Sequence, residues 1–283
     1  MRKYCLSLLL LFLTLVSNAV EPPKREIRGV WLTTVYGLDW PHNPATTETG
    51  RKAQQRDVCD ILDRLQDANF NTVFLQVRMR GDVIWRSAIE PASKTFSGKY
   101  GMMPGYDPLA FVVDECHKRG MECHAWFVTF LLGTDKSVKE QGKLSVVRRQ
   151  PKLCKRHNGE WYLDPGVPGT SDYVLSLVKE LVNGYDIDGI HFDYIRYPEQ
   201  AKSFPDKNLY NKYGKKRPLA EWRRENINKM VYRIYDWVKS VKPWIQVSSS
   251  PLGKYNRIER VPNAGWTAYE SVFQDPKMWM QNG

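Results

Sequence analysis

A histidine and an aspartate stand two residues apart in the run Asp188–Pro198, which reads DGIHFDYIRYP. Ile190 and Phe192 are apolar and β-prone, so this run predicts a short buried strand, in which successive side chains point to opposite faces. His191 and Asp193 then share one face where the strand ends. Because α/β proteins place their chemistry at the carboxyl ends of parallel strands, Asp193 is the first candidate for a catalytic or ligand-binding carboxylate.

A purely structural role is the alternative for Asp193. Its carboxylate could pair with Arg196 or Arg78 and hold a loop, since structural ion pairs are also found in such places. The pattern is repeated, which argues against this alternative: the other predicted strands also carry polar or aromatic residues at alternating positions, so that these side chains point to one face. These residues are Trp31 and Thr33, Gln76 and Arg78, His124 and Trp126, and Gln246, Ser248 and Ser250.

The elements that position these residues alternate along the chain. We expect the other strands at 27–35, 72–77, 121–128 and 245–249, and helices at 51–68, 107–120, 171–185 and 220–241. Val58, Ile61, Leu62 and Leu65 have the three- and four-residue spacing of one buried helix face. Long loops follow the strands and short turns follow the helices, which predicts parallel βα units.

Each predicted strand ends with polar or aromatic side chains on the same face. A closed ring of strands, whose interior opens to solvent at the carboxyl ends, explains this arrangement better than an open sheet does. The first strand is not followed by a glycine-rich phosphate loop, which argues against a Rossmann sheet. A TIM barrel needs eight strands in about 250 residues, whereas five are recognised here. The sequence therefore predicts a TIM-type (β/α) barrel domain over 27–283 that is truncated after about five βα units and ends in an open edge.

The N-terminus has the form of a secretion signal. Arg2 and Lys3 precede the apolar run Leu6–Val16, and Ser17-Asn18-Ala19 is a small-x-small cleavage site. We expect a signal peptide over 1–19, a linker over 20–26 and an exported protein, periplasmic or extracellular, with no stable membrane span after cleavage. An uncleaved anchor is the alternative.

Composition narrows the classes of partner. The net charge of +11, from 42 Lys+Arg against 31 Asp+Glu, favours anionic partners such as carboxylate-bearing glycans, lipid head groups or nucleic acid. The basic residues are scattered, and no RNA-binding signature, zinc-finger spacing or P-loop occurs, so we do not expect nucleic-acid binding. Cys59, Cys116, Cys123 and Cys154 follow the signal without any C-x-x-C pair, which favours free thiols over a metal site.

Six runs together resemble the glycosyl hydrolase-like 10 family, in order and over almost the whole chain after the signal. They are Arg28–Trp31, Phe70–Val73 with Gln76–Arg78, Gly105–Leu109, His124–Phe127, Leu163–Gly166 and Gly189–Tyr194. The resemblance implies a TIM-barrel glycoside hydrolase exported in bacteria, with peptidoglycan glycan as the expected substrate, and three further βα units that this chain lacks. Relatives often carry a second Asp where Tyr194 stands here.

Glycoside hydrolysis usually needs two carboxyl groups beside the glycosidic bond, one of them protonated. Asp193, near Arg78 and Arg196, suits a nucleophile or base. Its partner would come from Asp82, Glu90 or Asp164, or from a C-terminal region absent here. Asp82 is the preferred candidate, with a turn position after Gly81 as its structural alternative.

Other mouth residues are expected to bind substrate. His124 and His191 could hydrogen-bond sugar hydroxyls, orient Asp193 or be structural. Flat faces for sugar rings are offered by Trp31, Trp85, Trp126 and Tyr197. The remaining candidate binding residues are Gln76, Arg78, Asp164, Tyr194, Arg196 and Ser250.

Two other function classes stay open. A barrel that lacks its acid or three strands could bind glycan without cleaving it, or be inactive. A metal-dependent deacetylase or hydrolase would rest on His124, His191 and Asp193, but Arg78 at the same level would oppose a cation. We therefore expect no metal and no cofactor.

Overall fold

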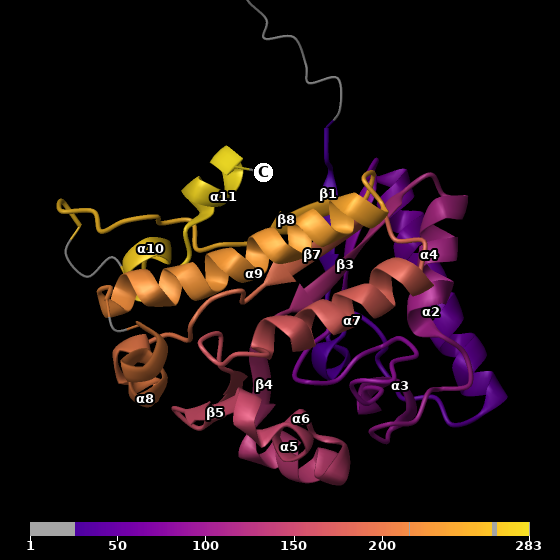
Figure 1. Ribbon diagram of the computed structural model, residues 1–283. Helices are drawn as coiled ribbons and strands as arrows, with labels where there is room; N and C mark the ends of the chain where they lie inside the picture. The colour runs from indigo at the N-terminus through magenta and orange to yellow at the C-terminus, as the bar shows by residue number, and fades with distance from the viewer. Residues whose placement is uncertain (1–25, 215, 262–264, 283) are drawn as a thin grey trace, which may run out of the picture.

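The computed structural model describes residues 26–214, 216–261 and 265–282, and at its centre lies a five-stranded parallel sheet (Figure 1). Its strand order is β1 (Gly29–Leu32), β2 (Thr72–Arg78), β3 (Glu122–Val128), β7 (Gly189–Asp193) and β8 (Gln246–Ser249). Each neighbouring pair is parallel, so all five carboxyl ends lie at the same edge. The predicted α/β architecture with parallel strands is confirmed.

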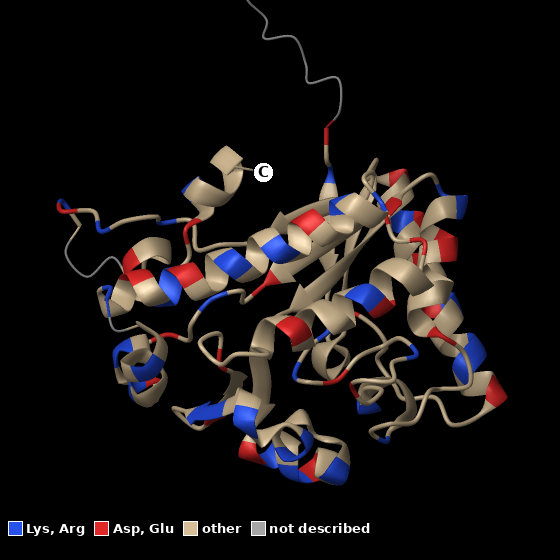
Figure 2. Cartoon of the chain, viewed as in Figure 1, with Lys and Arg blue, Asp and Glu red and all other residues tan. Residues whose placement is uncertain are grey.

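Four long helices connect these strands: α2 (Glu48–Asp67), α4 (Pro108–Lys118), α7 (Thr170–Gly184) and α9 (Leu219–Val241). Local sequence sets their starts. The Thr47 hydroxyl accepts a hydrogen bond from the Gly50 amide, and Asp107 caps α4 at the Ala110 amide, with Pro108 in the first turn. Their apolar faces and one face of the sheet form a single buried core. Lysine and arginine are scattered over many elements, as expected (Figure 2).

The segment between β3 and α7, expected to be a loop, carries a second sheet. It contains β4 (Leu131–Thr134), α5 (Asp135–Gln141), η2 (Gly142–Leu144), α6 (Val146–Arg149), η3 (Pro151–Leu153), β5 (Cys154–His157) and β6 (Glu160–Leu163). The three strands pair antiparallel in the order β4-β6-β5. Each has only four residues, too few for alternation to stand out in the sequence. We call residues 131–163 the inserted subdomain.

Short elements fill the remaining loops. They are η1 (Val35–Gly37), α3 (Lys94–Ser97), η4 (Ala201–Ser203), α8 (Lys207–Leu209), the π-helical η5 (Tyr210–Gly214), α10 (Ala268–Ser271) and α11 (Pro276–Asn282). The last two lie after β8, in the C-terminal part of the described chain. Helix α11 is tied to α9 by a 2.7 Å hydrogen bond from Trp279 Nε1 to Asn228 Oδ1.

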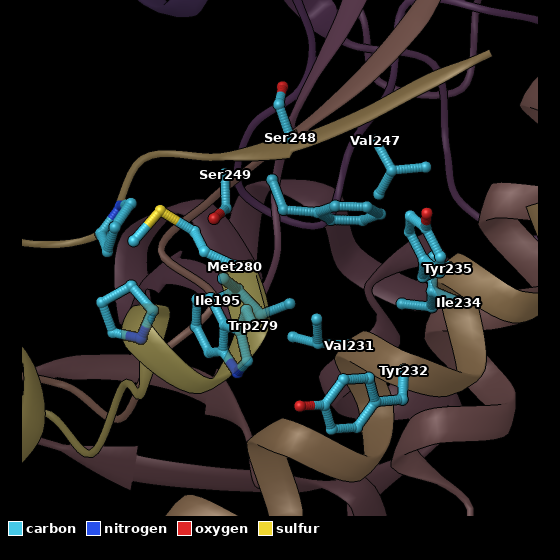
Figure 3. Close-up of a pocket in the computed structure, with 13 residues that line it drawn as sticks. Ile195, Val231, Tyr232, Ile234, Tyr235, Val247, Ser248, Ser249, Trp279 and Met280 are labelled. Carbon is cyan, nitrogen blue, oxygen red and sulfur yellow. The ribbon is translucent and has the colours of Figure 1, made fainter. Parts of the chain in front are cut away.

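The described strands do not close into a barrel, and an open edge after the fifth strand was expected. Within them β1 pairs only with β2, and β8 only with β7, so the sheet is open at both edges. A TIM barrel closes with eight strands of matched tilt and stagger. Beside β8, an apolar cavity of about 330 Å³ is lined by side chains such as Val247, Ile234 and Trp279 (Figure 3). The truncation itself stays a prediction.

Other expectations concern the cysteines and the N-terminus. Cys59, Cys116, Cys123 and Cys154 are free thiols, as expected. The predicted signal peptide and all of the linker except Glu26 lie outside the described residues. None of the described helices is both long and apolar enough to cross a membrane.

Candidate functional site

Asp193 lies at the carboxyl end of β7, where three neutral donors hold its half-buried carboxylate. Trp126 Nε1 donates to Oδ2 at 3.1 Å, while Ser250 Oγ and the Tyr194 amide donate to Oδ1 at 3.1 and 2.8 Å. These donors come from β3, the residue after β8, and the residue after β7. Tyr194 has a φ of 49°, a left-handed conformation that is uncommon for this residue type and is found at functional sites. Three hydrogen bonds thus fix the orientation of the Asp193 carboxylate.

Neither predicted arginine pairs with Asp193. Arg196 pairs with Glu199 at 2.7 Å, and Arg78 forms a fully buried pair with Glu90. Both bonds from Arg78 to the Glu90 carboxylate, from Nε and Nη2, measure 2.7 Å, and Tyr173 OH donates to the same carboxylate at 2.9 Å. Glu90 is therefore not a free second carboxylate, and Arg78 has no free face for a substrate.

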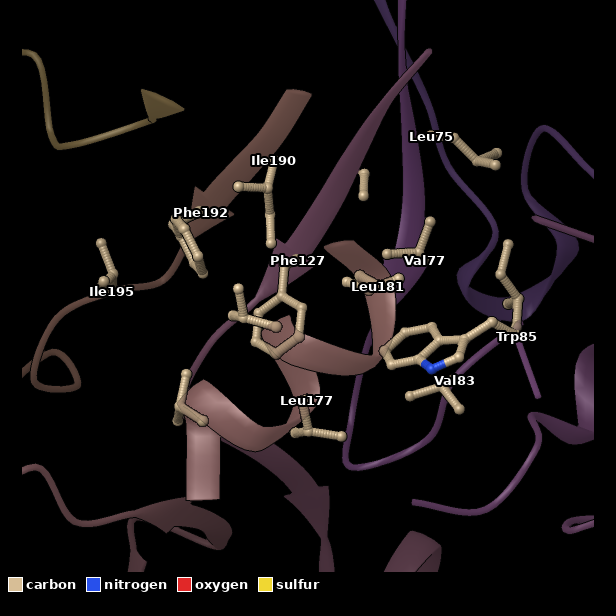
Figure 4. Close-up of a cluster of buried hydrophobic side chains, with 14 of the residues drawn as sticks. Leu75, Val77, Val83, Trp85, Phe127, Leu177, Leu181, Ile190, Phe192 and Ile195 are labelled. Carbon is tan, nitrogen blue, oxygen red and sulfur yellow. The ribbon is translucent and has the colours of Figure 1, made fainter. Parts of the chain in front are cut away.

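A β-bulge explains the position of Arg78. Gln76 pairs with Trp126, but Arg78 pairs with Phe127, the next residue of β3, so the register shifts between them. The two residues therefore do not share a face as alternation predicted. The Arg78 guanidinium instead lies 5.0 Å from the centre of the Phe127 ring, one of the core side chains labelled in Figure 4.

His191 and His124 occupy the same face as Trp126 but do not hydrogen-bond Asp193. His191 Nδ1 lies 2.8 Å from Ser248 Oγ, and burial lowers the pKa of His191 to about 4, so its ring is neutral at pH 7. His124 Nε2 lies 3.0 Å from a Glu122 carboxylate oxygen. Among the described residues His191 Nε2 and His124 Nδ1 have no hydrogen-bond partner. It is Trp126, expected only as a flat face, that orients the aspartate.

Two of the expected aromatic platforms are core residues. Trp85 is fully buried, and its indole Nε1 donates to the Glu180 carboxylate at 3.1 Å (Figure 4). Tyr197 is also fully buried, and its hydroxyl accepts a hydrogen bond from Asn226 Nδ2 at 3.3 Å. Trp31 differs, since it is 49% exposed and stacks on Phe74 with 4.7 Å between ring centres. Only Trp31 among these three therefore keeps a face open to solvent. Gln76 accepts from the Thr34 and Val35 amides, which shapes the turn after β1.

Asp82 is the candidate second carboxylate, and it is buried four residues beyond β2. The Arg80 amide donates to its Oδ1 at 3.2 Å, and burial, with the nearby Glu90 charge, raises the pKa of Asp82 to about 6. Only β3 separates β2 from β7, so these two strands lie roughly 10 Å apart at the strand spacing of parallel sheets. Asp82 also lines a cavity of about 330 Å³.

Asp164, the other loop carboxylate, is completely buried after β6. Its Oδ1 accepts from the Gly166 amide at 2.8 Å, and burial, aided by Asp206, raises its pKa to about 6. Its Oδ2 finds no partner in the described parts of the chain. With no exposed surface, Asp164 has less access to a substrate than Asp193 has. Nor does any group of three or more His, Cys, Asp or Glu in the described residues have the arrangement of a metal site.

Comparisons with known proteins agree on one family. The profile described as glycosyl hydrolase-like 10 matches residues 26–283. Glycosyl hydrolase DigH of Escherichia coli K12 is 36% identical over 282 residues, which cover 93% of this chain and 64% of that protein. Glycosyl hydrolase YngK of Bacillus subtilis is 33% identical over 271 residues, 92% of this chain and 52% of that protein. The chain thus spans between about half and two thirds of these relatives.

Solved structures of TIM-barrel glycoside hydrolases resemble this fold. Alpha-L-fucosidase isoenzyme 2 from Paenibacillus thiaminolyticus superposes with a TM-score of 0.52 at 17% identity, covering 82% of this chain and 33% of the other. At this identity the likeness concerns the fold alone.

Proposed function

The chain belongs to the glycosyl hydrolase-like 10 family, and on this premise we propose that it is an exported glycoside hydrolase acting on a bacterial polysaccharide, the glycan of peptidoglycan. The observation that carries the proposal is the Asp193 carboxylate, held at the carboxyl edge of the sheet by Trp126, Ser250 and the Tyr194 amide. A carboxylate oriented by neutral donors is free of any ion pair among the described residues, so its charge is available to a substrate.

In this proposal Asp193 acts as base or nucleophile and Asp82 as the acid. The acid must carry a proton when it meets the leaving oxygen, and burial gives Asp82 the raised pKa that this role requires. Asp193 ends β7, whereas Asp82 lies in the loop four residues beyond β2, and one strand, β3, separates β2 from β7. The separation of the two carboxyl groups, rather than that of the strands, decides between inversion and retention, so the configuration of the product is the quantity to measure.

The test is release of soluble fragments from purified peptidoglycan glycan. This chain should release them, and Asp193→Asn should reduce the rate on the order of 10³-fold, because a positioned acid–base group contributes 10²–10⁴-fold. Asp186→Asn is the matched control: it removes the same charge before β7, at the opposite edge of the sheet, where the carboxylate is 86% exposed. NMR would give the anomeric configuration of the first product and so distinguish inversion from retention. Equal rates for all three proteins would refute the role of Asp193.

Glycan binding without cleavage is the second candidate function, favoured by the open edges of the sheet. A domain of this kind could hold a glycan at the Asp193 face while part of the catalytic set lies elsewhere. Retention on a glycan column without release of fragments, together with release by a form of the length of the relatives, would favour it.

A further inference from the structure

A cavity of about 330 Å³ with several charged side chains in its wall lies where β1 and β2 end, and the inserted subdomain forms part of that wall. Its lining comes from five places: η1, the loop after β2, α3 with the residues that follow it, the last residue of β4, and α5. The charged and phenolic side chains among the lining residues are Tyr36, Arg80, Asp82, Lys94, Tyr100, Lys136 and Glu140. Segments far apart in the sequence thus supply the polar groups of one pocket.

Arg80 is held in place within this pocket. Its Nη1 donates to Tyr36 OH at 2.6 Å, its guanidinium lies 5.2 Å from the centre of the Tyr36 ring, and Gln141 Nε2 donates to its backbone carbonyl at 3.1 Å. Gly133 makes room for it: a Cβ at Gly133 would lie 3.2 Å from the Arg80 Cβ and 2.4 Å from Ser137 Oγ. The φ of Gly133, +94°, also disfavours any other residue. The side chain is therefore preorganised.

The charge of the pocket is not balanced by its own carboxylates. Lys94 pairs with Glu140, so these two charges offset each other. Neither Arg80 nor Lys136 forms an ion pair within 4 Å among the described residues, although the Lys94 hydrogen bond and, with it, the Lys136 charge lower the pKa of Glu140. The remaining carboxyl, Asp82, has its pKa raised to about 6 by burial. Two cations thus face a space that contains one weakly acidic group.

We propose that this pocket binds the carboxylate of an acidic sugar ring next to the ring that is cleaved at Asp193. The inference rests on the proposed function and names its substrate as a carboxylate-bearing glycan. A guanidinium presents a planar fork that matches a carboxylate, and Lys136 adds a second charge. Tyr36, 71% exposed, offers a ring face to the sugar. The pocket lies at the end of β2 and Asp193 at the end of β7, and these strands are roughly 10 Å apart. The pocket would therefore hold a sugar ring next to the ring that is cleaved.

The experiment measures binding to peptide-free cell-wall glycan strands whose lactyl carboxylates are either free or methyl-esterified. All proteins carry Asp193→Asn so that the strands stay intact during calorimetry. Esterification should weaken binding at least roughly tenfold, because it removes charge-assisted hydrogen bonds to the guanidinium. Arg80→Gln should weaken binding of the free-acid strands by about the same factor and leave binding of the ester unchanged. Arg80→Lys should recover part of the loss.

Lys139→Gln is the matched control. Lys139 lies on α5, three residues after Lys136, and its removal changes the net charge equally, but it does not line the cavity. Its affinity should match that of the parent protein, and melting temperatures would verify that every variant is folded. Equal binding of both strand types, or equal losses for Arg80→Gln and Lys139→Gln, would overturn the proposal. Equally tight binding of sulfated strands would overturn the assignment to a carboxylate.

The two proposals fail in different ways. Arg80-dependent preference for the free acid, without fragment release by the parent chain, would support the pocket and refute the hydrolase. Release from free and esterified strands at equal rates, unchanged by Arg80→Gln, would support the hydrolase and refute the pocket.

Discussion

Two carboxylates at the same edge of the sheet have opposite surroundings. Glu90 is fully buried and receives two bonds from Arg78 and one from Tyr173. Asp193 is half-buried and receives three bonds, all from neutral donors. A buried charge must be paired, and the paired charge is then unavailable to a ligand. The comparison indicates that Glu90 stabilises the fold, and it supports the proposal that Asp193 is the carboxylate that meets a substrate.

The largest expected effect on stability comes from Glu90→Gln. It leaves the Arg78 guanidinium buried without its counter-charge, which should cost about 3–5 kcal/mol. Urea unfolding followed by circular dichroism would measure the loss. A decrease of less than about 1 kcal/mol in the free energy of unfolding would mean that the Arg78–Glu90 pair contributes little to stability.

Asp82→Asn should lower the rate of glycan cleavage on the order of 10²-fold, as expected for loss of a general acid. The pKa of Asp82 is raised to about 6, so its proton is lost as pH rises through 6, and the activity of the parent chain should fall there. Rates between pH 4 and 8 would show this decline in the parent and its absence in the variant. An unchanged decline in Asp82→Asn would assign the acid to another group, Asp164 being the next candidate.

Trp126→Phe should have a smaller effect, about tenfold on cleavage. It removes one of the three donors to Asp193 while keeping an aromatic ring, and tenfold corresponds to about 1.5 kcal/mol, the lower end of what a hydrogen bond to a charged group contributes. Steady-state kinetics should show the loss in kcat. Trp85→Phe is the control, because Trp85 donates to Glu180 in the core, away from Asp193. Equal kcat losses in both variants would point to a packing effect.

The smallest stability effect should come from Asp193→Asn, within about 1 kcal/mol of the parent. The amide retains one oxygen acceptor, and no described cation is left unpaired by the change. Urea unfolding of Asp193→Asn and Glu90→Gln under the same conditions would compare their free energies of unfolding directly. Similar destabilisation in the two variants would contradict the division between a structural and a chemical carboxylate.

Much of the parallel sheet was predictable from sequence. The helix expected at 220–241 is α9, Leu219–Val241, and the strand expected at 121–128 is β3, Glu122–Val128. Both follow from local apolar periodicity, which burial of one face imposes. The β4-β6-β5 sheet was missed because its four-residue strands are stabilised by partners distant in sequence, which no local pattern records.

Within the candidate site, the position of Asp193 was predictable but its contacts were not. Alternation along β7 placed it at a strand end, on the face of His191. Alternation failed for Arg78, because the bulge after Gln76 changes the face on which later side chains lie. Tyr197 was expected at the mouth, yet it lies fully buried in the core.

The sequence alone determined the order of βα units and the polar residues at strand ends, because both are written in the spacing of neighbouring residues. Tertiary structure alone decided that Arg78 binds Glu90, that Trp126 orients Asp193, and that Arg80 and Lys136 meet in one pocket. Those outcomes depend on which distant segments pack together, and burial free energy is gained only when the whole sheet and its helices assemble.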